Sequence, residues 1–343
     1  TAGDAHDLAE TLTRAFNEPL IVVGQPIKMT ASIGIASAPM HGDTADQLMR
    51  HADIALYEAK ARGRDRAVFF AADMAWDLED RRAIEVDLRQ AIEQDALTIN
   101  WQPIISTLTG KTVGVEALLR WLHPTRGYLS PAVFVPIAED SGLMPRLGAW
   151  AIDRALAEGK RWPHLKISIN LSPVQFRHVD LEQELPLALA RHGVDSRRIV
   201  LEVTEGVLLE TSNRTRQVIE GLRRMGFEVA LDDFGTGYSS LGYLCNFGFD
   251  KIKIDRSFVR GISEHRKLKT IVQAVVTIGR GLGMRIVAEG VETESEAAMM
   301  RLFGCNEMQG FFFSRPLDAK GIDARLIAEQ IEPDRPVRAA AAQ

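Results

Sequence analysis

The chain has 343 residues, and at about 150 residues per domain this length predicts roughly two domains. Lysine and arginine total 41 against 46 aspartates and glutamates, and a formal net charge of −5 at pH 7 argues against binding of a nucleic-acid polymer in bulk. Hydrophobic residues make up 46% of the chain, which excludes a chain that is disordered throughout, and no apolar run is long enough to span a membrane.

Short elements alternate over the first 70 residues. We predict a helix over 5–16, a strand over 27–36, a helix over 44–61 and a strand over 68–70. The pattern lapses at 71–75, and a charged helix follows over 78–94 with Ile84, Leu88 and Ile92 on one stripe. The domain boundary is therefore predicted here. The predicted domains are 1–75 and 76–330, followed by a flexible tail over 331–343.

A strand-then-helix rhythm extends from about residue 97 to 316. The eight predicted strands cover 97–106, 112–119, 165–171, 199–204, 228–232, 251–255, 285–289 and 307–312. Helical patterns separate most of them, at 146–161, 181–192, 214–225, 268–282 and 294–302. Eight strands in roughly 220 to 250 residues match an α/β fold of the (β/α)₈ barrel type. Because only a short turn at Thr109-Gly110 joins the first two strands, we predict a TIM-like barrel with one antiparallel strand.

Polar residues share one face of these strands. In 251–255, Ile252 and Ile254 oppose Lys253. The apolar face suits the helix layer, so the polar face turns into the barrel. The residues predicted inside, near the strand ends where barrel active sites lie, are Glu116, Asn170, Glu202, Asp232, Asp233, Lys253 and Glu289.

Each of these residues, considered alone, is typical of a solvated, ion-paired or turn position without a catalytic role. Taken together, several carboxylates and one amide at one barrel mouth repel one another unless cations neutralise them. Oxygen ligands without His or Cys favour Mg²⁺ or Mn²⁺ over Zn²⁺. Either Asp232 or Asp233 could bridge to a second ion, and two ions about 3.5–4 Å apart clamp a phosphoryl displacement. Lys253 would orient or help activate the water, or offset charge on the phosphate.

Other features carry less weight. The glycine-rich run at 235–240 lacks the Gly-Lys-Ser/Thr of a P-loop, so we predict a loop beside the site. Arg120 has two open interpretations, a phosphate ligand or a structural ion pair. Gln309 holds a metal-bound water or is a loop amide. The histidines show no metal-ligand spacing, so no catalytic histidine is predicted.

Ordered motifs across residues 80 to 320 resemble the EAL domain family of cyclic di-GMP phosphodiesterases. They are Gln102-Pro103, Glu116-Ala117-Leu118, Asn170-Leu171-Ser172-Pro173, Glu202-Val203-Thr204-Glu205, Asp232-Asp233-Phe234-Gly235, Lys253-Ile254-Asp255, Ala288-Glu289-Gly290-Val291-Glu292 and Gln309-Gly310. The resemblance implies bacterial second-messenger signalling, with cyclic di-GMP as the substrate and hydrolysis of one phosphodiester to linear pGpG. It also implies two metal ions and a homodimer through the barrel.

The same resemblance assigns roles to individual residues. The implied metal ligands are Glu116, Asn170, Glu202, Asp232 and Asp233. The implied catalytic residues are Lys253, Glu289 and Glu116, with Lys253 near the attacking water. The implied substrate contacts are Gln102, Arg120 and Gln309, with Gln309 and Glu289 also holding metal-bound waters. Glu205 is implied to anchor the loop after the fifth strand.

Two other functions stay open beside the enzyme. One is a catalytically silent module that senses cyclic di-GMP, although the acidic residues that such sensors usually lack are present. The other is a competent barrel gated by protein contact. Segments 32–36 and 52–60 resemble the C-terminal part of a GGDEF domain, the diguanylate cyclase fold, but the Gly-Gly-Asp-Glu-Phe segment is absent. We therefore expect no cyclase activity from residues 1–75.

The cellular setting follows from cysteine usage and the first residue. Cys245 and Cys305 are too few for a disulfide framework, so we expect a reducing compartment, the cytoplasm. Thr1 stands where a start Met would, and no targeting segment follows it. We expect a longer parent protein whose upstream regulatory domains, and any membrane anchor, lie outside this chain.

Overall fold

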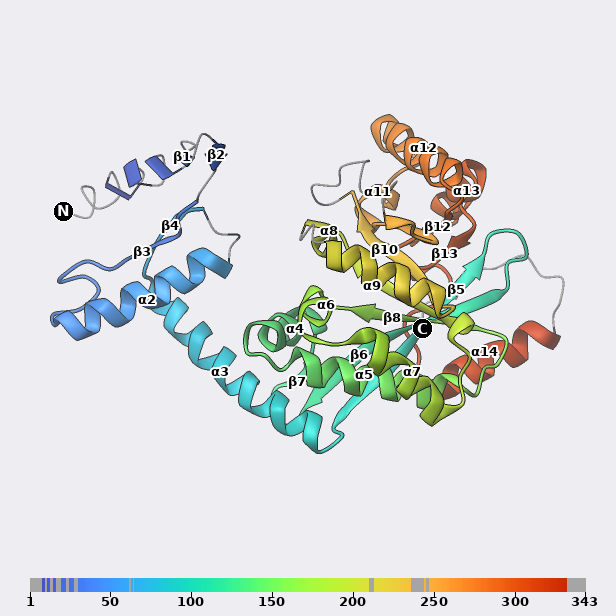
Figure 1. Cartoon of the computed structure of the whole chain (residues 1–343), viewed down its shortest axis with the longest axis horizontal. Helices are drawn as coiled ribbons and strands as arrows, with labels where there is room; N and C mark the ends of the chain where they lie inside the picture. Colours follow the sequence, from blue (N-terminus) through green and yellow to red (C-terminus); the bar gives the residue numbers. More distant parts are fainter. Residues whose placement is uncertain are drawn as a thin grey trace. The chain divides into compact units, whose positions relative to one another are not determined.

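The structure of the chain is a computed structural model. It describes residues 30–331 apart from 62, 64, 210–212, 236–243 and 245–246, and before residue 30 only 8–9, 11–12, 15–16, 20–22 and 25–27. Two compact units, Thr1–Asp87 and Leu88–Gln343, make up the chain (Figure 1). The predicted tail after 331, Cys245, most of the glycine-rich loop and parts of the predicted first helix lie outside the described residues.

The first unit contains two small sheets. β1 (Leu20–Val22) pairs antiparallel with β2 (Gln25–Ile27), and β3 (Ile33–Ile35) pairs parallel with β4 (Ala67–Phe69). The helix α2 (Ala45–Ala61) joins β3 to β4, in the predicted strand, helix, strand order. Its Ile54 and Ala55 pack with Phe70 in a small apolar cluster. The predicted strand over 27–36 is wrong in extent, since the β3 ladder covers only 33–35.

The boundary between the two units falls within the helix α3 (Ala72–Glu93), between Asp87 and Leu88. The predicted lapse at 71–75 is wrong, because the helix already begins at Ala72. Ala72 and Ala75 are strong helix formers, so the first turn forms without an apolar stripe. The boundary at residue 75 stays a prediction.

The second unit is a closed barrel with one antiparallel strand, as predicted. β5 (Leu97–Ser106) runs antiparallel to both of its neighbours, β6 (Thr112–His123) and β13, and its pairing with β6 closes the ring. The remaining strands are parallel to β6: β8 (Lys166–Leu171), β9 (Ile199–Thr204), β10 (Glu228–Phe234), β11 (Lys251–Ile254), β12 (Arg285–Ala288) and β13 (Glu307–Met308).

Helices surround this ring (Figure 1). They are α4 (Pro131–Asp140), α5 (Met144–Gly159), α6 (Pro173–His178), α7 (Leu181–His192), α8 (Gly206–Leu209), α9 (Asn213–Arg224), α11 (Arg256–Val259), α12 (Arg266–Gly281), α13 (Glu294–Phe303) and α14 (Ala319–Ile331), with a short 3₁₀ turn at Ser196–Arg198. Among the residues described, no helix combines the length and the apolar character needed to cross a bilayer.

Two strands differ from the prediction. β7 (Gly127–Leu129) is an extra strand that pairs antiparallel with the end of β6. β13 spans only two residues, whereas 307–312 was predicted. The reason is hydrogen bonding with the segment that follows β12. Val291 N donates to Gln309 O, and Phe312 N donates to Val291 O, so the chain leaves the ladder after Met308.

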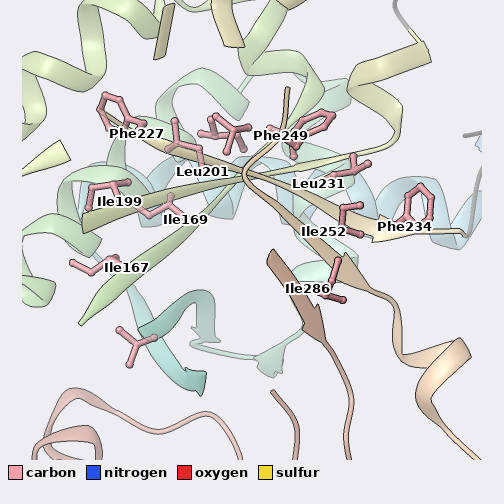
Figure 2. Close-up of a cluster of buried hydrophobic side chains, with 14 of the residues drawn as sticks. Ile167, Ile169, Ile199, Leu201, Phe227, Leu231, Phe234, Phe249, Ile252 and Ile286 are labelled. Carbon is pink, nitrogen blue, oxygen red and sulfur yellow. The ribbon is translucent and has the colours of Figure 1, made fainter. Parts of the chain in front are cut away.

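The apolar faces of the strands point toward the helices, as the alternation predicts (Figure 2). Ile167, Leu201, Ile252 and Ile286 are all fully buried in this layer. The helices approach closely at glycines: a Cβ at Gly159 would lie 2.4 Å from Ile167 Cδ1. The inward face carries the polar side chains of the strands, together with the buried apolar residues Val200, Ala230 and Val287.

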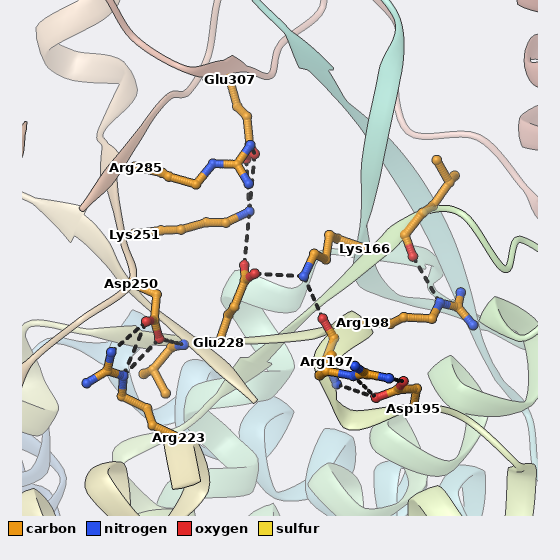
Figure 3. A network of polar contacts seen from close by, with 12 residues as sticks. Lys166, Asp195, Arg197, Arg198, Arg223, Glu228, Asp250, Lys251, Arg285 and Glu307 are labelled. Carbon is orange, nitrogen blue, oxygen red and sulfur yellow. Dashed lines mark hydrogen bonds and ion pairs between the residues drawn. The ribbon is translucent and has the colours of Figure 1, made fainter. Parts of the chain in front are cut away.

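A network of ion pairs fills the amino-terminal end of the barrel (Figure 3). Lys251 Nζ lies 3.0 Å from Glu307 Oε2 and 3.6 Å from Glu228 Oε2. Lys166 Nζ lies 2.7 Å from Glu228 Oε1, and Arg285 Nη2 lies 2.5 Å from Glu307 Oε1. Polar groups at this end of a barrel serve stability, and the opposite end carries the chemistry.

Candidate active site

A single buried lysine organises the carboxyl-terminal end of the barrel. Lys253, on β11, is 2% exposed and is surrounded by carboxylates from four other strands or strand ends. Its Nζ lies 2.5 Å from Glu202 Oε2, 2.6 Å from Glu289 Oε1, 3.2 Å from Asp232 Oδ1 and 3.8 Å from Glu116 Oε2. Lys253 and these four carboxylates lie inside the barrel, where the strand alternation predicts them.

Amide side chains surround Glu116. Asn170 Nδ2 donates to Glu116 Oε1 at 2.8 Å, and Gln309 Nε2 donates to Glu116 Oε2 at 2.5 Å. Gln309 Nε2 also lies 3.2 Å from Gln102 Oε1. Gln102 stands opposite Glu116 in the β5–β6 ladder, so the antiparallel strand brings it to the site. Glu116 thus has both oxygens fixed in place.

Asp233 is aimed by local backbone geometry. The pairing of β10 with β11 shifts register between Leu231 and Phe234, and Asp233 has a φ of +53°. A bulge of this kind redirects a side chain at the end of a strand. One oxygen each of Asp232, Asp233 and Glu289 lie within 4.8 Å of one another, a spacing that suits one metal ion.

The protonation equilibria of the cluster reflect a shortage of positive charge. Burial, reinforced by Glu116 and Asp232, raises the pKa of Glu202 to about 8 despite the opposing effect of Lys253. Burial and the neighbouring carboxylates likewise hold the pKa of Glu289 well above its ordinary value. For Asp233, burial and then Asp232 raise the pKa. One ammonium does not neutralise this many carboxylates.

Two groups of the cluster shift the other way. Burial disfavours the charged form of Lys253, but Asp232 and Glu116 outweigh it, so the lysine pKa is raised well above its ordinary value. Burial also opposes ionisation of Glu116, yet Lys253 and the hydrogen bonds of Gln309 and Asn170 keep its pKa lowered. Glu116 and Lys253 therefore form the charged centre of the cluster.

The residues present fit divalent metal ions. The donors are carboxylate and amide oxygens, which Mg²⁺ and Mn²⁺ prefer. Gln309 Oε1 is buried and accepts no hydrogen bond from any residue that the structure describes, so it is available to a water held in the site. Ions at this position would supply the positive charge that the raised pKa values of the carboxylates indicate is missing.

A cavity of about 670 Å³ opens above the cluster. Seven of the site residues predicted from the sequence line this cavity: Gln102, Glu116, Asp232, Asp233, Lys253, Glu289 and Gln309. Glu202 lies beneath it and is 2% exposed. Arg256, Ser257 and Phe311 also line the cavity but were not predicted, since Arg256 and Ser257 lie in the one-turn helix α11 and Phe311 lies in a turn, where strand alternation does not apply.

Two predicted residues lie apart from the cluster. Arg120 Nη1 donates to Leu119 O at 2.8 Å, and the side chain lines a separate cavity of about 470 Å³ with Tyr128 and Arg315. Glu205 is buried, and its Oε1 accepts a hydrogen bond from Gly235 N at 2.7 Å. That bond is made to the first residue of the glycine-rich run, and the anchoring role of Glu205 stays a prediction.

The raised carboxyl pKa values predict how the metal-free protein responds to pH. The pKa of Glu202 rises from 4.5 to about 8 on folding, so its contribution to stability is full below pH 4.5 and is lost as pH passes through about 8. Glu289 and Asp233 act in the same direction, and Glu116 acts against them.

We therefore expect urea unfolding with a chelator present to show a falling free energy of unfolding between pH 5 and 8. Glu202→Gln, which cannot ionise, should flatten that slope. A free energy of unfolding that rises across the same interval in the parent protein would contradict the assignment.

Comparisons with known proteins complete the description of the site. The EAL domain family matches residues 85–316, and the family described as "Diguanylate cyclase, GGDEF domain" matches residues 1–66. Among curated proteins, the bifunctional diguanylate cyclase/cyclic di-GMP phosphodiesterase MucR of Pseudomonas aeruginosa is 39% identical over 322 residues, which cover 92% of this chain and 47% of MucR.

Two further relatives agree with this match. The cyclic di-GMP phosphodiesterase NbdA of Pseudomonas aeruginosa is 34% identical over 340 residues, 98% of this chain and 43% of NbdA. The solved PaMucR phosphodiesterase in complex with c-di-GMP is 39% identical with a TM-score of 0.67, and the match covers 70% of this chain and 99% of that one. The chain spans under half the length of MucR and of NbdA.

Proposed function

The chain belongs to the EAL domain family, and from that premise we propose that its barrel hydrolyses cyclic di-GMP to linear pGpG. The observation that carries the proposal is the cluster of carboxylates around Lys253 beneath a cavity of about 670 Å³. A bare sensor of the dinucleotide has no need of a buried, charge-deficient cluster, whereas a metal-dependent hydrolase does.

The proposed reaction adds water across one P–O3′ bond of the cyclic dinucleotide. Two Mg²⁺ or Mn²⁺ ions held by Glu116, Asn170, Glu202, Asp232 and Asp233 would supply an activated water and neutralise charge on the phosphate. Lys253 offsets negative charge on the phosphate as the bond breaks, and Glu289, 2.6 Å from the ammonium, keeps it in position. Gln309 Oε1, buried and without a hydrogen-bond partner among the described residues, would accept a hydrogen bond from a water in the site.

Chelation should abolish the reaction. With EDTA, formation of pGpG is expected to fall below about 1% of its rate with Mg²⁺, since the metal supplies several kcal/mol of transition-state stabilisation. Chromatography of the products after incubation with cyclic di-GMP measures this directly, and Mg²⁺ or Mn²⁺ should restore the rate. Hydrolysis that persists in EDTA would refute the metal requirement, and tight binding without pGpG would assign a sensor instead.

The remaining assignments accompany this proposal. We propose that residues 1–75 are the C-terminal remnant of a GGDEF-type domain without cyclase activity and that residues 76–330 are the catalytic barrel. A homodimer through the barrel, regulation by domains of a longer parent protein and a cytoplasmic location are further parts of the proposal. Substrate contacts by Gln102 and Arg120 also belong to it.

A further inference from the structure

Positive charge is scarce in the lining of the active-site cavity. Among the described lining residues only Lys253 and Arg256 are basic. The acidic ones are Glu116, Asp232, Asp233, Asp255, Glu289 and Glu292. Lys253 is buried and engaged by four carboxylates, whereas Arg256 is exposed and makes no ion pair with any residue that the structure describes. Arg256 is therefore the exposed cation among the described lining residues, and its charge is not already engaged by a carboxylate of the cluster.

The backbone at Arg256 is held in a fixed position beside the cluster. Asp255 Oδ1 accepts a hydrogen bond from Ser257 N at 2.9 Å and so fixes the turn that contains Arg256. On its other side lies Gly290, which follows Glu289 and has a φ of +63°. A Cβ at Gly290 would lie 2.3 Å from Arg256 Cβ, so the two backbones are in close contact. The base of the side chain is thereby set next to the carboxylate cluster.

The chemistry of the substrate supplies a partner for this arginine. Cyclic di-GMP carries two phosphodiesters, and only one can occupy the carboxylate cluster where it reacts. Arg120 lines a separate cavity, and apart from Lys253 and Arg256 the charged residues described in this lining are acidic. The second phosphate is therefore repelled here unless a cation meets it. A guanidinium presents a planar fork of donors that matches two phosphate oxygens.

We propose that Arg256 binds the phosphate of cyclic di-GMP that is not cleaved, and so selects the cyclic dinucleotide over simple phosphodiesters. This inference rests on the proposed function of the site. Arg256 is a specificity residue, since it faces a part of the substrate remote from the bond that breaks.

Binding and turnover test the proposal separately. Calorimetry with Ca²⁺, which accepts less regular oxygen coordination than Mg²⁺, should give a Kd for cyclic di-GMP that is about 10- to 100-fold weaker for Arg256→Ala. With Mg²⁺, the same change should raise KM for cyclic di-GMP but leave kcat/KM for bis(p-nitrophenyl) phosphate, which has one phosphate, unchanged. Arg260→Ala is the matched control, since Arg260 is exposed on the same turn but does not line the cavity.

Conservative variants identify the group that Arg256 meets. If it is a phosphate, Arg256→Lys should retain more affinity than Arg256→Gln, because charge matters most. If Gln equals or exceeds Lys, the contact is to a base edge and the proposal is wrong. Equal losses for both substrates, or no change in Kd, would also overturn it. Weakened binding without any turnover by the parent protein would instead leave Arg256 assigned and refute the proposed hydrolysis.

Discussion

Glu116→Gln is expected to lower the rate of cyclic di-GMP hydrolysis by about 10²- to 10⁴-fold, the range that corresponds to several kcal/mol of lost transition-state stabilisation. The substitution keeps the size of the side chain, and it removes a carboxylate whose pKa is lowered. That carboxylate is charged at neutral pH and is fixed by two amide side chains, so it is ready to hold a metal ion. Steady-state rates with saturating Mg²⁺ measure the loss.

The matched control is Glu228→Gln at the other end of the barrel. Glu228 also accepts from a lysine inside the ring, with Lys166 Nζ at 2.7 Å. It is remote from the cavity, so its removal should alter thermal stability but leave the rate per folded molecule unchanged. If Glu116→Gln hydrolyses the substrate as fast as the parent protein, the assignment of Glu116 as a metal ligand is incorrect.

Lys253→Met should have two separable effects. Turnover is expected to fall by about 10²- to 10³-fold because a fixed positive charge near the phosphate is lost. The metal-free protein should also lose about 3–5 kcal/mol of stability, because four buried or half-buried carboxylates lose their counter-ion. Urea unfolding in EDTA measures the second effect.

Divalent ions distinguish this lysine from its neighbour two residues away. Mn²⁺ should restore much of the stability of Lys253→Met, since the metal can neutralise the same carboxylates. Lys251→Met removes an equally buried lysine from the same strand, but its partner Glu307 lies at the amino-terminal end, so Mn²⁺ should not restore that variant. Equal recovery of both variants would refute a metal site centred on the Lys253 cluster.

The number and length of the strand-then-helix repeats were sufficient to predict the barrel, and alternation along the strands was sufficient to predict which residues face inward. Lys253 opposes Ile252 and Ile254, and that parity alone turned it into the ring. Parity also put Lys251 on the inward face, but it could not reveal the pairing with Glu307, because those residues are 56 positions apart and meet only when the ring closes. Sequence patterns indicate which face of a strand a residue lies on. Its ion-pair partner depends on how the barrel closes.

The features that were missed depend on turns and loops. β13 is short because Val291 takes the hydrogen bonds of residues 309 and 312, a competition between distant segments that no local pattern contains. Arg256 reaches the cavity from the start of the short helix α11 and Phe311 from a turn, where period-two alternation does not apply. The aiming of Asp233 depends on a φ of +53°, which residue identity did not indicate.

The reversed direction of β5 determines where the polypeptide enters the barrel. Leu97 pairs with Trp121 near the carboxyl end of β6, so the first strand begins on the substrate side of the ring, whereas a uniformly parallel barrel would begin on the opposite side. From that entrance the strand descends past Thr98, opposite Arg120, to Gln102, opposite Glu116. Gln102 therefore lies nine residues after the helix end at Glu93, and it is the first strand-borne residue of the predicted site that the chain reaches after α3.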